Sequence, residues 1–289
     1  MAVDRRVIRR RRAVALGVVV LALVAVVVAV AAVPHVHRHH AAPPPPPPPK
    51  TYRIVFPEGF TRAQMADRVS AVARIARRER HGRPVRLAAK PYLAASRAGR
   101  IPCFGGARRT NLEGFLFPST YDFIAATTSQ QLVQKQLQAF CTSWRSVDLR
   151  YARSKNLTSY DVLTIASMIQ GEAVVASERP LIAAVIYNRL RLGMPLGIDA
   201  ALRYALHIPG TKSILESQLH NPTPYNLRLH TGLPPTPIDN PGFASIEAAA
   251  HPAHVDYLYF VAKPDKRHHF FTASASAFQQ YECAHGYGC

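Results

Sequence analysis

Glu172 is the residue in this sequence best suited to acid–base chemistry. It follows Asp161 to Gly171, where apolar residues recur at the spacing of one helix face: Val162, Ile165, Ala166 and Ile169. If the helix continues to Glu172, its carboxyl group extends that apolar face. Burial raises the pKa of a carboxyl group, and a general acid near neutral pH needs a raised pKa. The structural alternative is a helix-end glutamate paired with Arg179 or Arg189.

Five further residues could bind a polar substrate, and each also has a simpler structural explanation. Glu113 could be a turn residue, and Asp199 could cap the helix that follows it. Asn188 could line a groove or brace one. Tyr225 and Asn226 lie in a proline-rich loop, where an aromatic ring and an amide could hold a sugar. No nucleophile triad order, phosphate loop or zinc motif is present, so we expect neither a metal nor a cofactor.

Residues 51–125 predict a compact strand–helix–helix–strand unit. Tyr52 to Phe56 alternates as a strand does, and Thr61 can cap the helix after the turn that follows. A short second helix is expected over Pro91 to Ala98, and an extended segment over Phe115 to Phe123. The end of the first helix carries an arginine cluster, which suits the helix dipole: Arg77, Arg78, Arg80 and Arg83.

Residues 126–289 are richer in helix patterns, and the fold class we expect for the exported part is α+β. Ser159 is the expected N-cap of the helix leading to Glu172, and Ser177 that of the next helix. Pro222 to Pro241 holds six prolines and must be mostly loop. The other expected elements are helices around 132–140, over 179–192 and over 245–250, and strands over 257–262 and 269–272.

The N-terminus predicts a membrane anchor. Residues 1–12 are a basic tail, and residues 13–33 follow without a charge, about the length that crosses a bilayer. The arginines of the tail favour a cytoplasmic N-terminus, so we expect a single-pass protein of the cell membrane with the rest outside the cytoplasm. The alternative is a cleaved signal peptide ending near Ala29 to Ala31, although such peptides have a shorter apolar core. Both interpretations export the remainder.

Residues 34–50 predict a spacer. Seven consecutive prolines, Pro43 to Pro49, favour an extended polyproline II segment. Four histidines precede them, and we interpret these as hydrated linker residues because no partner ligands accompany them. The spacer would hold an exported domain away from the membrane.

The net charge of +19 is not confined to the N-terminus. Seven arginines and one aspartate in residues 1–42 leave +13 on the remainder. A basic folded part suits an anionic partner such as nucleic acid, anionic lipid or wall polymer, and the membrane segment argues against nucleic acid. The alternative is a solvated surface that is basic without a partner.

The four cysteines lie in the exported part, where disulfides persist. None has metal-ligand spacing, and four cysteines allow three pairings. Proximity in the sequence favours Cys103–Cys141 and Cys283–Cys289.

Several blocks of the exported part resemble the endolytic murein transglycosylases of the MltG/YceG type. The blocks occur in the right order and extend over essentially everything after the proline run. They are Leu112 to Pro118 (LEGFLFP), Ile165 to Ala173 (IASMIQGEA), Glu178 to Leu196, Pro224 to Asn226 and Thr231 to Tyr259.

The resemblance implies a LysM-like subdomain over residues 51–125 and a catalytic domain over residues 126–289. The catalytic glutamate of the family falls on Glu172. Relatives often carry a second glutamate where this sequence has Gln170, which weakens the idea of a carboxylate pair on this helix.

The implied reaction is a lyase reaction on MurNAc–GlcNAc bonds of nascent peptidoglycan strands. Glu172 would protonate the bridging oxygen and then accept the proton of the C6 hydroxyl, which closes a 1,6-anhydro ring. Endolytic cutting, control of strand length and proximity to peptidoglycan synthases rest on the resemblance alone.

Two other functions fit the residues. A wall-binding protein would tolerate glutamine at position 172. A hydrolase would pair Glu172 with Glu113 or Asp199 and leave reducing ends.

Overall fold

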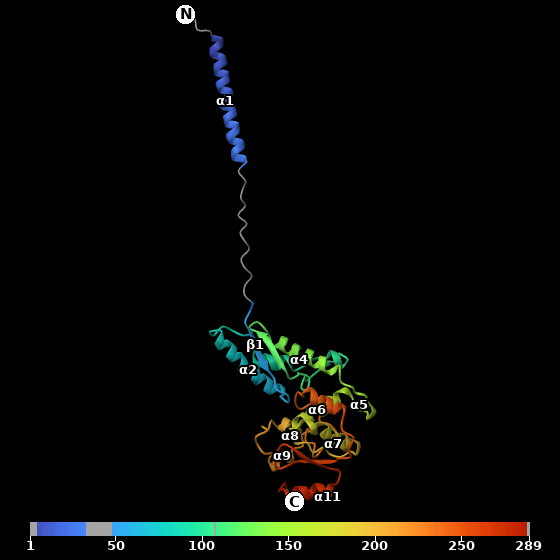
Figure 1. The fold of residues 1–289 in the computed structure, drawn as a ribbon. Helices are drawn as coiled ribbons and strands as arrows, with labels where there is room; N and C mark the ends of the chain where they lie inside the picture. The colour runs from blue at the N-terminus through green and yellow to red at the C-terminus, as the bar shows by residue number, and fades with distance from the viewer. Residues whose placement is uncertain (1–4, 33–47, 107, 288–289) are drawn as a thin grey trace. The chain divides into compact units, whose positions relative to one another are not determined.

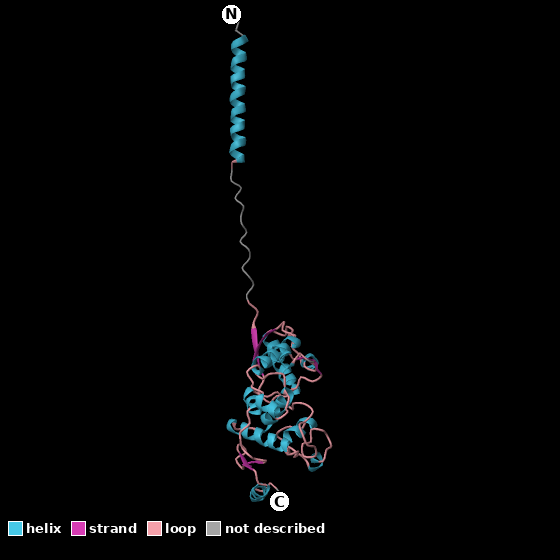
Figure 2. Cartoon of the chain, turned by 90° about the vertical axis from the view of Figure 1, so that its right-hand side faces the viewer, coloured by secondary structure: helices cyan, strands magenta, loops and turns pink. Residues whose placement is uncertain are grey.

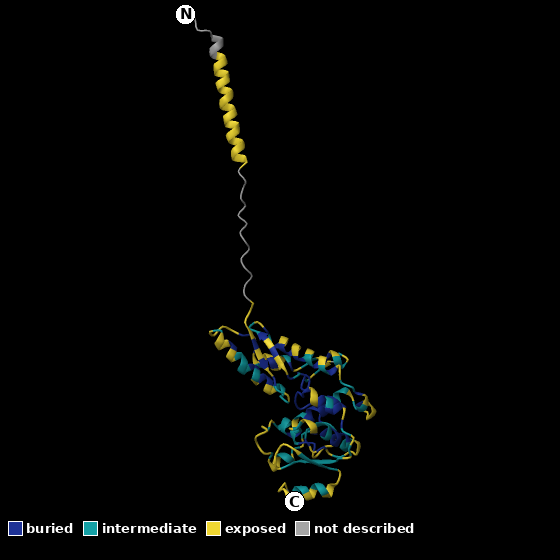
Figure 3. Ribbon diagram, in the orientation of Figure 1, coloured by how far each residue is buried: buried dark blue, intermediate teal, exposed yellow. Residues whose placement is uncertain are grey.

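The computed structural model describes residues 5–32, 48–106 and 108–287, and the chain divides into one unit up to Pro48 and another from Pro49 (Figure 1). The described part of the first unit is helix α1 (Arg5–Ala31). Its segment Arg9–Ala31 has a mean hydropathy of 3.2 and is long and apolar enough to cross a membrane. The helix is exposed along its length from Arg9 (Figure 3). The predicted linker lies mostly outside the described residues.

The second unit begins with the strand–helix–helix–strand order that the sequence predicted. Strand β1 (Thr51–Val55) pairs antiparallel with β4 (Thr120–Ile124), with Tyr52 opposite Phe123. Helix α2 (Arg62–Glu79) starts at a capping box in which Thr61 and Gln64 satisfy each other's backbone amides. The second helix, α3 (Ala89–Ala95), precedes two short elements that we did not predict. These are the hairpin β2 (Gly99–Arg100) and β3 (Arg108–Arg109), with the 3-10 turn η1 (Pro102–Phe104) between its strands.

The extended segment expected from Phe115 is shorter than predicted, because the chain turns before it reaches β4. Gly114 has φ +88°, and a Cβ there would lie 2.7 Å from Pro237. The amide of Leu116 donates to the Asn240 side chain at 2.8 Å instead of to a neighbouring strand. This turn therefore docks against a distant part of the chain.

The rest of the second unit is mainly helical with one more hairpin (Figure 2). Strands β5 (Tyr259–Ala262) and β6 (His269–Thr272) lie within the two predicted strand segments and pair antiparallel. The helices are α4 (Ser129–Trp144), α5 (Arg150–Ser154), α6 (Ser159–Glu172), the 3-10 turn η2 (Ala176–Glu178), α7 (Arg179–Arg191), α8 (Asp199–Leu206), α9 (Glu216–Leu219), α10 (Phe243–Ala250) and α11 (Ala275–Ala284). Helices α5, α9 and α11 and the turn η2 were not predicted.

Helix α6 is the central element of this region. Every residue from Val162 to Ile169 is buried, and α7 and α10 pack against it. Its N-cap is Thr158, one residue earlier than predicted, because Thr158 forms a capping box with Asp161. Ser177 is likewise not a cap: it lies within η2, and Glu178 is the residue before α7. The sequence located both helices, including the first residue of α7, and missed their N-caps.

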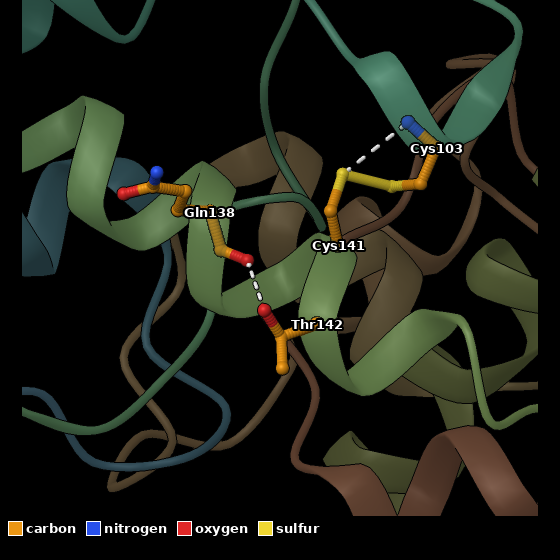
Figure 4. The surroundings of a disulfide bond; sticks show 4 residues. All are labelled: Cys103, Gln138, Cys141 and Thr142. Atoms are coloured by element: carbon orange, nitrogen blue, oxygen red, sulfur yellow. Dashed lines mark hydrogen bonds between the residues drawn. A yellow bond between two sulfur atoms is a disulfide. The ribbon is translucent and has the colours of Figure 1, made fainter.

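Residues 49–289 form one compact unit, and packing continues across the predicted boundary at residue 125. Helix α4 packs against α3 and β4. The predicted disulfide Cys103–Cys141 is present and joins the hairpin region to α4 (Figure 4). The Cys103 amide also donates to the Cys141 sulfur at 3.4 Å. The other predicted pair includes Cys289, which lies outside the described residues.

Cys103→Ser combined with Cys141→Ser should lower the free energy of unfolding by about 4 kcal/mol, because the bond closes a loop with a sequence separation of 38. Urea unfolding with and without reductant would measure this. Reductant should destabilise the parent much more than the variant, in which only Cys283 remains disulfide-bonded among the described cysteines. Equal stability of the two proteins without reductant would contradict the prediction.

Candidate active site

Glu172 is the last residue of α6, and as a residue it is half-buried. The preceding turn of the helix is fully buried at Met168 and Ile169, so the backbone of Glu172 is firmly placed. Gly171 lies against the start of α8: a Cβ on Gly171 would come within 2.9 Å of the Ala200 Cβ. The absence of a side chain at Gly171 lets the end of α6 and the start of α8 meet closely.

This contact sets the electrostatics of Glu172. Desolvation by the surrounding protein raises the pKa of its carboxyl group, and the negative charge of Asp199 raises it further. A hydrogen bond from the backbone amide of Ala200 acts in the opposite direction, as do the nearby His269 and Arg203. Opposing influences therefore act on the pKa of Glu172, and the Ala200 amide is the backbone donor that stabilises its ionised form.

The start of α8 is held by a charge pair that the sequence did not reveal. Arg228 donates to both oxygens of Asp199, with Nε–Oδ1 and Nη2–Oδ2 distances of 2.8 and 3.0 Å. The two side chains are 47% and 38% exposed, so a ligand can reach them. Asp199 is the first residue of α8 and not its cap, which corrects the structural alternative given above.

Arg189 fixes the turn before α8. Its Nη1 group donates to the carbonyl oxygens of Pro195 and Leu196 at 3.1 and 2.8 Å, and its Nε group donates to Leu258 at the edge of β5. The guanidinium also lies 5.2 Å from the centre of the Tyr259 ring. Arg189 therefore braces backbone and is not the partner of a helix-end glutamate.

The other arginine considered as a partner for Glu172 is also engaged elsewhere. Arg179 donates to the hydroxyl of Ser245 at 3.2 Å. Among the described residues, Glu172 forms no ion pair within 4.0 Å. The simple explanation of Glu172 as one half of a surface salt bridge is therefore not supported.

Gln170 locks the end of α6 to the start of α10. Its side-chain oxygen accepts hydrogen bonds from the amide of Gly242 at 3.0 Å and the hydroxyl of Ser245 at 2.8 Å. An amide at this position therefore has a structural task that a carboxylate could also perform, since only the acceptor is used.

A nearly buried carboxylate–imidazole pair lies beside this region. Glu178 accepts from His269 twice, from its amide at 3.0 Å and from Nδ1 at 2.7 Å, and both side chains are less than 10% exposed. The pair ties the β5–β6 hairpin to the segment between α6 and α7. It also brings His269 near Glu172, a neighbour that sequence reasoning missed because about 100 residues separate the two.

Glu113 lies at a buried junction within the second unit. Its Oε1 atom accepts from the Arg62 amide at 2.9 Å and from the Asn240 side chain at 2.8 Å, and Tyr204 donates to Oε2 at 3.3 Å. The residue is only 3% exposed, and this burial raises the pKa of its carboxyl group to about 7. Glu113 thus joins α2 to α8 and the loop before α10.

Asp239 is a second buried carboxyl group close to Glu113. It is 6% exposed, and its Oδ1 atom has no hydrogen-bond partner. Burial raises its pKa well above the usual range, and the charge of Glu113 adds to this effect. Such a buried site accommodates the neutral, protonated form of Asp239 better than its carboxylate.

The remaining predicted substrate-binding residues contact protein groups. The Asn226 side chain is fully buried and donates to the carbonyl oxygens of Leu219 and Asn221, both at 2.8 Å. Asn188 donates to the carbonyl oxygens that precede β5, at 2.9 and 3.0 Å. Tyr225 is partly exposed and shares a hydrogen bond of 2.8 Å with the Thr236 hydroxyl. The structure thus leaves Asp199 and Tyr225 more accessible than Glu113 and Asn226.

A family model described as the YceG-like family matches residues 39–282. This chain belongs to the YceG-like family. A second model, the N-terminal domain of Rv3627c-like carboxypeptidases, matches residues 4–53, which include the apolar helix and the proline run.

Known proteins are similar to this YceG-like chain over part of its length. An endolytic murein transglycosylase of Bacillus subtilis is 40% identical over 152 residues, which cover 53% of this chain and 42% of the relative. One from Streptococcus pneumoniae is 38% identical over 168 residues, covering 56% and 30%. The chain thus spans less than half the length of these curated relatives. A crystal structure of a YceG-like protein from Listeria monocytogenes superposes with a TM-score of 0.64 at 27% identity, covering 79% of this chain and 75% of that one.

Glu113→Gln should change how the stability of this YceG-like protein depends on pH. The pKa of Glu113 is raised from 4.5 to about 7, so its stabilising effect is complete below the unfolded pKa and is lost as the pH rises through 7. Glutamine keeps the acceptor for Arg62 and Asn240 but cannot ionise. The loss of unfolding free energy between about pH 5 and about pH 8 should therefore be smaller in the variant, by on the order of 3 kcal/mol.

Urea unfolding at the two pH values would measure this difference. Asp67→Asn, the same chemical change at an exposed acid of α2, is the matched control and should follow the parent. A parent and a Glu113→Gln variant with parallel pH dependence would show that Glu113 is not the titrating group.

Proposed function

We propose that this chain is a peptidoglycan lytic transglycosylase that cuts within glycan strands, with Glu172 as its acid and base. The observation that carries the proposal is a single carboxyl group of raised pKa at a buried helix end, with a backbone amide directed at it. The names of the relatives, endolytic murein transglycosylases, supply the substrate class.

The reaction needs one group that gives a proton and then takes one back. Protonated Glu172 would donate to the oxygen bridging MurNAc and GlcNAc as the bond to the anomeric carbon breaks. The resulting carboxylate would accept the proton of the MurNAc C6 hydroxyl, whose oxygen bonds to the anomeric carbon. The products are a 1,6-anhydroMurNAc end and a free GlcNAc hydroxyl, no water is consumed, and Glu172 ends protonated as it began.

The surroundings of Glu172 suit both half-reactions. Desolvation and the charge of Asp199 favour the protonated form that the first step uses. The Ala200 amide, His269 and Arg203 favour the carboxylate present between the steps. A balance of this kind keeps the pKa of one residue within reach of the working pH in both roles.

Two of the predicted substrate-binding residues remain candidates for contacting the glycan. Asp199 and Tyr225 are accessible, and Asp199 lies next to the residue whose amide faces Glu172. For Glu113, Asn188 and Asn226 we propose positioning roles, because their side chains hold protein groups in place.

The setting we propose is the outer face of the cell membrane. Helix α1 would anchor the chain with its arginines in the cytoplasm, and the second unit would act on nascent strands close to peptidoglycan synthases. The β1–α2–α3–β4 arrangement would serve as a LysM-like subdomain, and cutting would limit strand length.

Glu172→Gln should abolish cleavage, lowering it by roughly 10²–10⁴-fold or below detection, because glutamine keeps the shape of the side chain but cannot donate the proton. The assay is digestion of purified glycan strands by the full chain in detergent, with mass spectrometry of the products. The parent should release anhydro-ended fragments. Gln170→Glu is the matched control two residues away and should remain active, since its acceptor oxygen is kept.

Other outcomes of the digestion would indicate a different function. Reducing ends from the parent would make the protein a hydrolase with a second carboxylate. Strands that bind to parent and variant alike without cleavage would favour a wall-binding protein.

Asp199→Asn and Arg228→Gln should move the pH dependence of kcat/KM in opposite directions. Removing the charge of Asp199 lowers the pKa of Glu172, so activity should fall at a lower pH than in the parent. Removing Arg228 leaves Asp199 unpaired and should extend activity to higher pH. Profiles of kcat/KM against pH would measure both shifts, and movement of both variants in the same direction would contradict the charge model.

A further inference from the structure

An unusually dense group of arginines covers the end of α2 and the turn after it. We call this group the arginine surface; its members are Arg74, Arg77, Arg78, Arg80, Arg83 and Arg86. All are exposed except Arg80, which is half-buried. The residues His81 and Gly82, both with positive φ, turn the chain so that the last two arginines follow directly after the helix.

Ion pairs within the protein do not account for the arginine surface. Within the part of the chain that the structure describes, none of its six guanidinium groups forms an ion pair or a side-chain hydrogen bond. The single acid among these residues, Glu79, is taken by Lys50 at 2.7 Å. One or two cations are enough to interact with the helix dipole at a C-terminus, because this interaction is confined to the last turn. Most of these guanidinium groups therefore repel one another and do not stabilise the fold.

Two contacts fix the arginine surface at the point where the chain enters the second unit. The Lys50–Glu79 pair joins the residue just before β1 to the last residue of α2. The amide of Arg86 donates to the carbonyl of Ala125 at 3.0 Å, and Ala125 follows Ile124, which pairs with Thr51. The end of α2 and the start of β1 accordingly lie at the same end of this unit (Figure 1).

The tether limits how far this end can be from the membrane. Residues 32–48 connect α1 to the second unit and span at most about 60 Å when fully extended. A surface confined to that distance experiences a high effective concentration of lipid headgroups, so even weak attraction gives substantial occupancy. Each arginine near an anionic bilayer adds to the attraction, and the contributions of several add up.

We propose that the arginine surface docks the second unit onto the anionic phospholipid headgroups of the membrane that holds α1, which rests on the proposed anchoring by α1. Guanidinium groups form paired hydrogen bonds with phosphate oxygens, and a flexible set of exposed arginines suits a fluid layer of such groups. The connecting residues 32–48 favour lipid over a soluble polyanion as the partner, because they keep this end of the unit within reach of the bilayer.

The test uses the full chain in nanodiscs of two compositions, one zwitterionic and one with about a third anionic phosphatidylglycerol. Hydrogen–deuterium exchange of peptides covering residues 74–86 reports docking, because backbone amides at the lipid surface lose solvent contact. The expected result is at least about threefold slower exchange in the anionic discs, reversed by high salt, which screens exposed charges.

A variant with glutamine at positions 74, 77, 78, 83 and 86 should lose this protection, since the docking constant falls by on the order of 100-fold or more. The matched control removes the same charge from exposed residues elsewhere on the second unit and should keep the protection. Its substitutions are Arg145→Gln, Arg153→Gln, Lys155→Gln, Arg191→Gln and Lys212→Gln.

Three results would overturn the proposal: equal exchange in both disc types, equal loss of protection in the control variant, or protection by soluble poly(glycerol phosphate) but not by anionic discs. Retention of the chain in zwitterionic discs tests the anchor separately. A chain that does not enter those discs would be tested by co-sedimentation with vesicles of the same two compositions, where binding to both or neither would also overturn the docking.

Discussion

The close approach of Gly171 to Ala200 is the contact on which the candidate active site depends. It places the Ala200 amide, in the first turn of α8, against the carboxyl group that ends α6, and no residue larger than glycine fits there without moving one of the two helices. The elements around it hold this contact in place: α7 and α10 bury α6, Gln170 fastens its end to α10, and Arg189 holds the turn that leads into α8. The chemistry of Glu172 is thus a property of helix packing and not of a flexible loop.

The unit contains two places where burial raises the pKa of a carboxyl group, and accessibility distinguishes them. Glu113 and Asp239 lie inside the protein, where their oxygens meet protein donors or nothing at all. Glu172 is half-buried as a residue and ends its helix, and it is the one for which we propose proton transfer to a ligand. A strongly shifted carboxyl group indicates function only when a substrate can reach it.

The sequence predicted the parts of the fold that depend on local patterns. Apolar spacing located α2 and α6, cap, proline and glycine signals located α7, and alternation located β1. Helix starts were missed by a residue where two possible caps are adjacent, as with Thr158 and Ser159. Glu172 was found because its position on an apolar face is a local property. Arg228, His269 and Asp239 were not found, since their importance comes from contacts between residues far apart in the sequence, which no spacing encodes.

Gln170 has a consequence for how the acidity of Glu172 can be varied. The amide holds Gly242 and Ser245 through its oxygen alone, a task that a glutamate can also perform. A glutamate would bring a second negative charge to the last turn of α6, and like charges raise the pKa of a neighbouring carboxyl group. An exchange of one nitrogen for one oxygen would therefore raise the pKa of Glu172 while keeping the contacts that join α6 to α10.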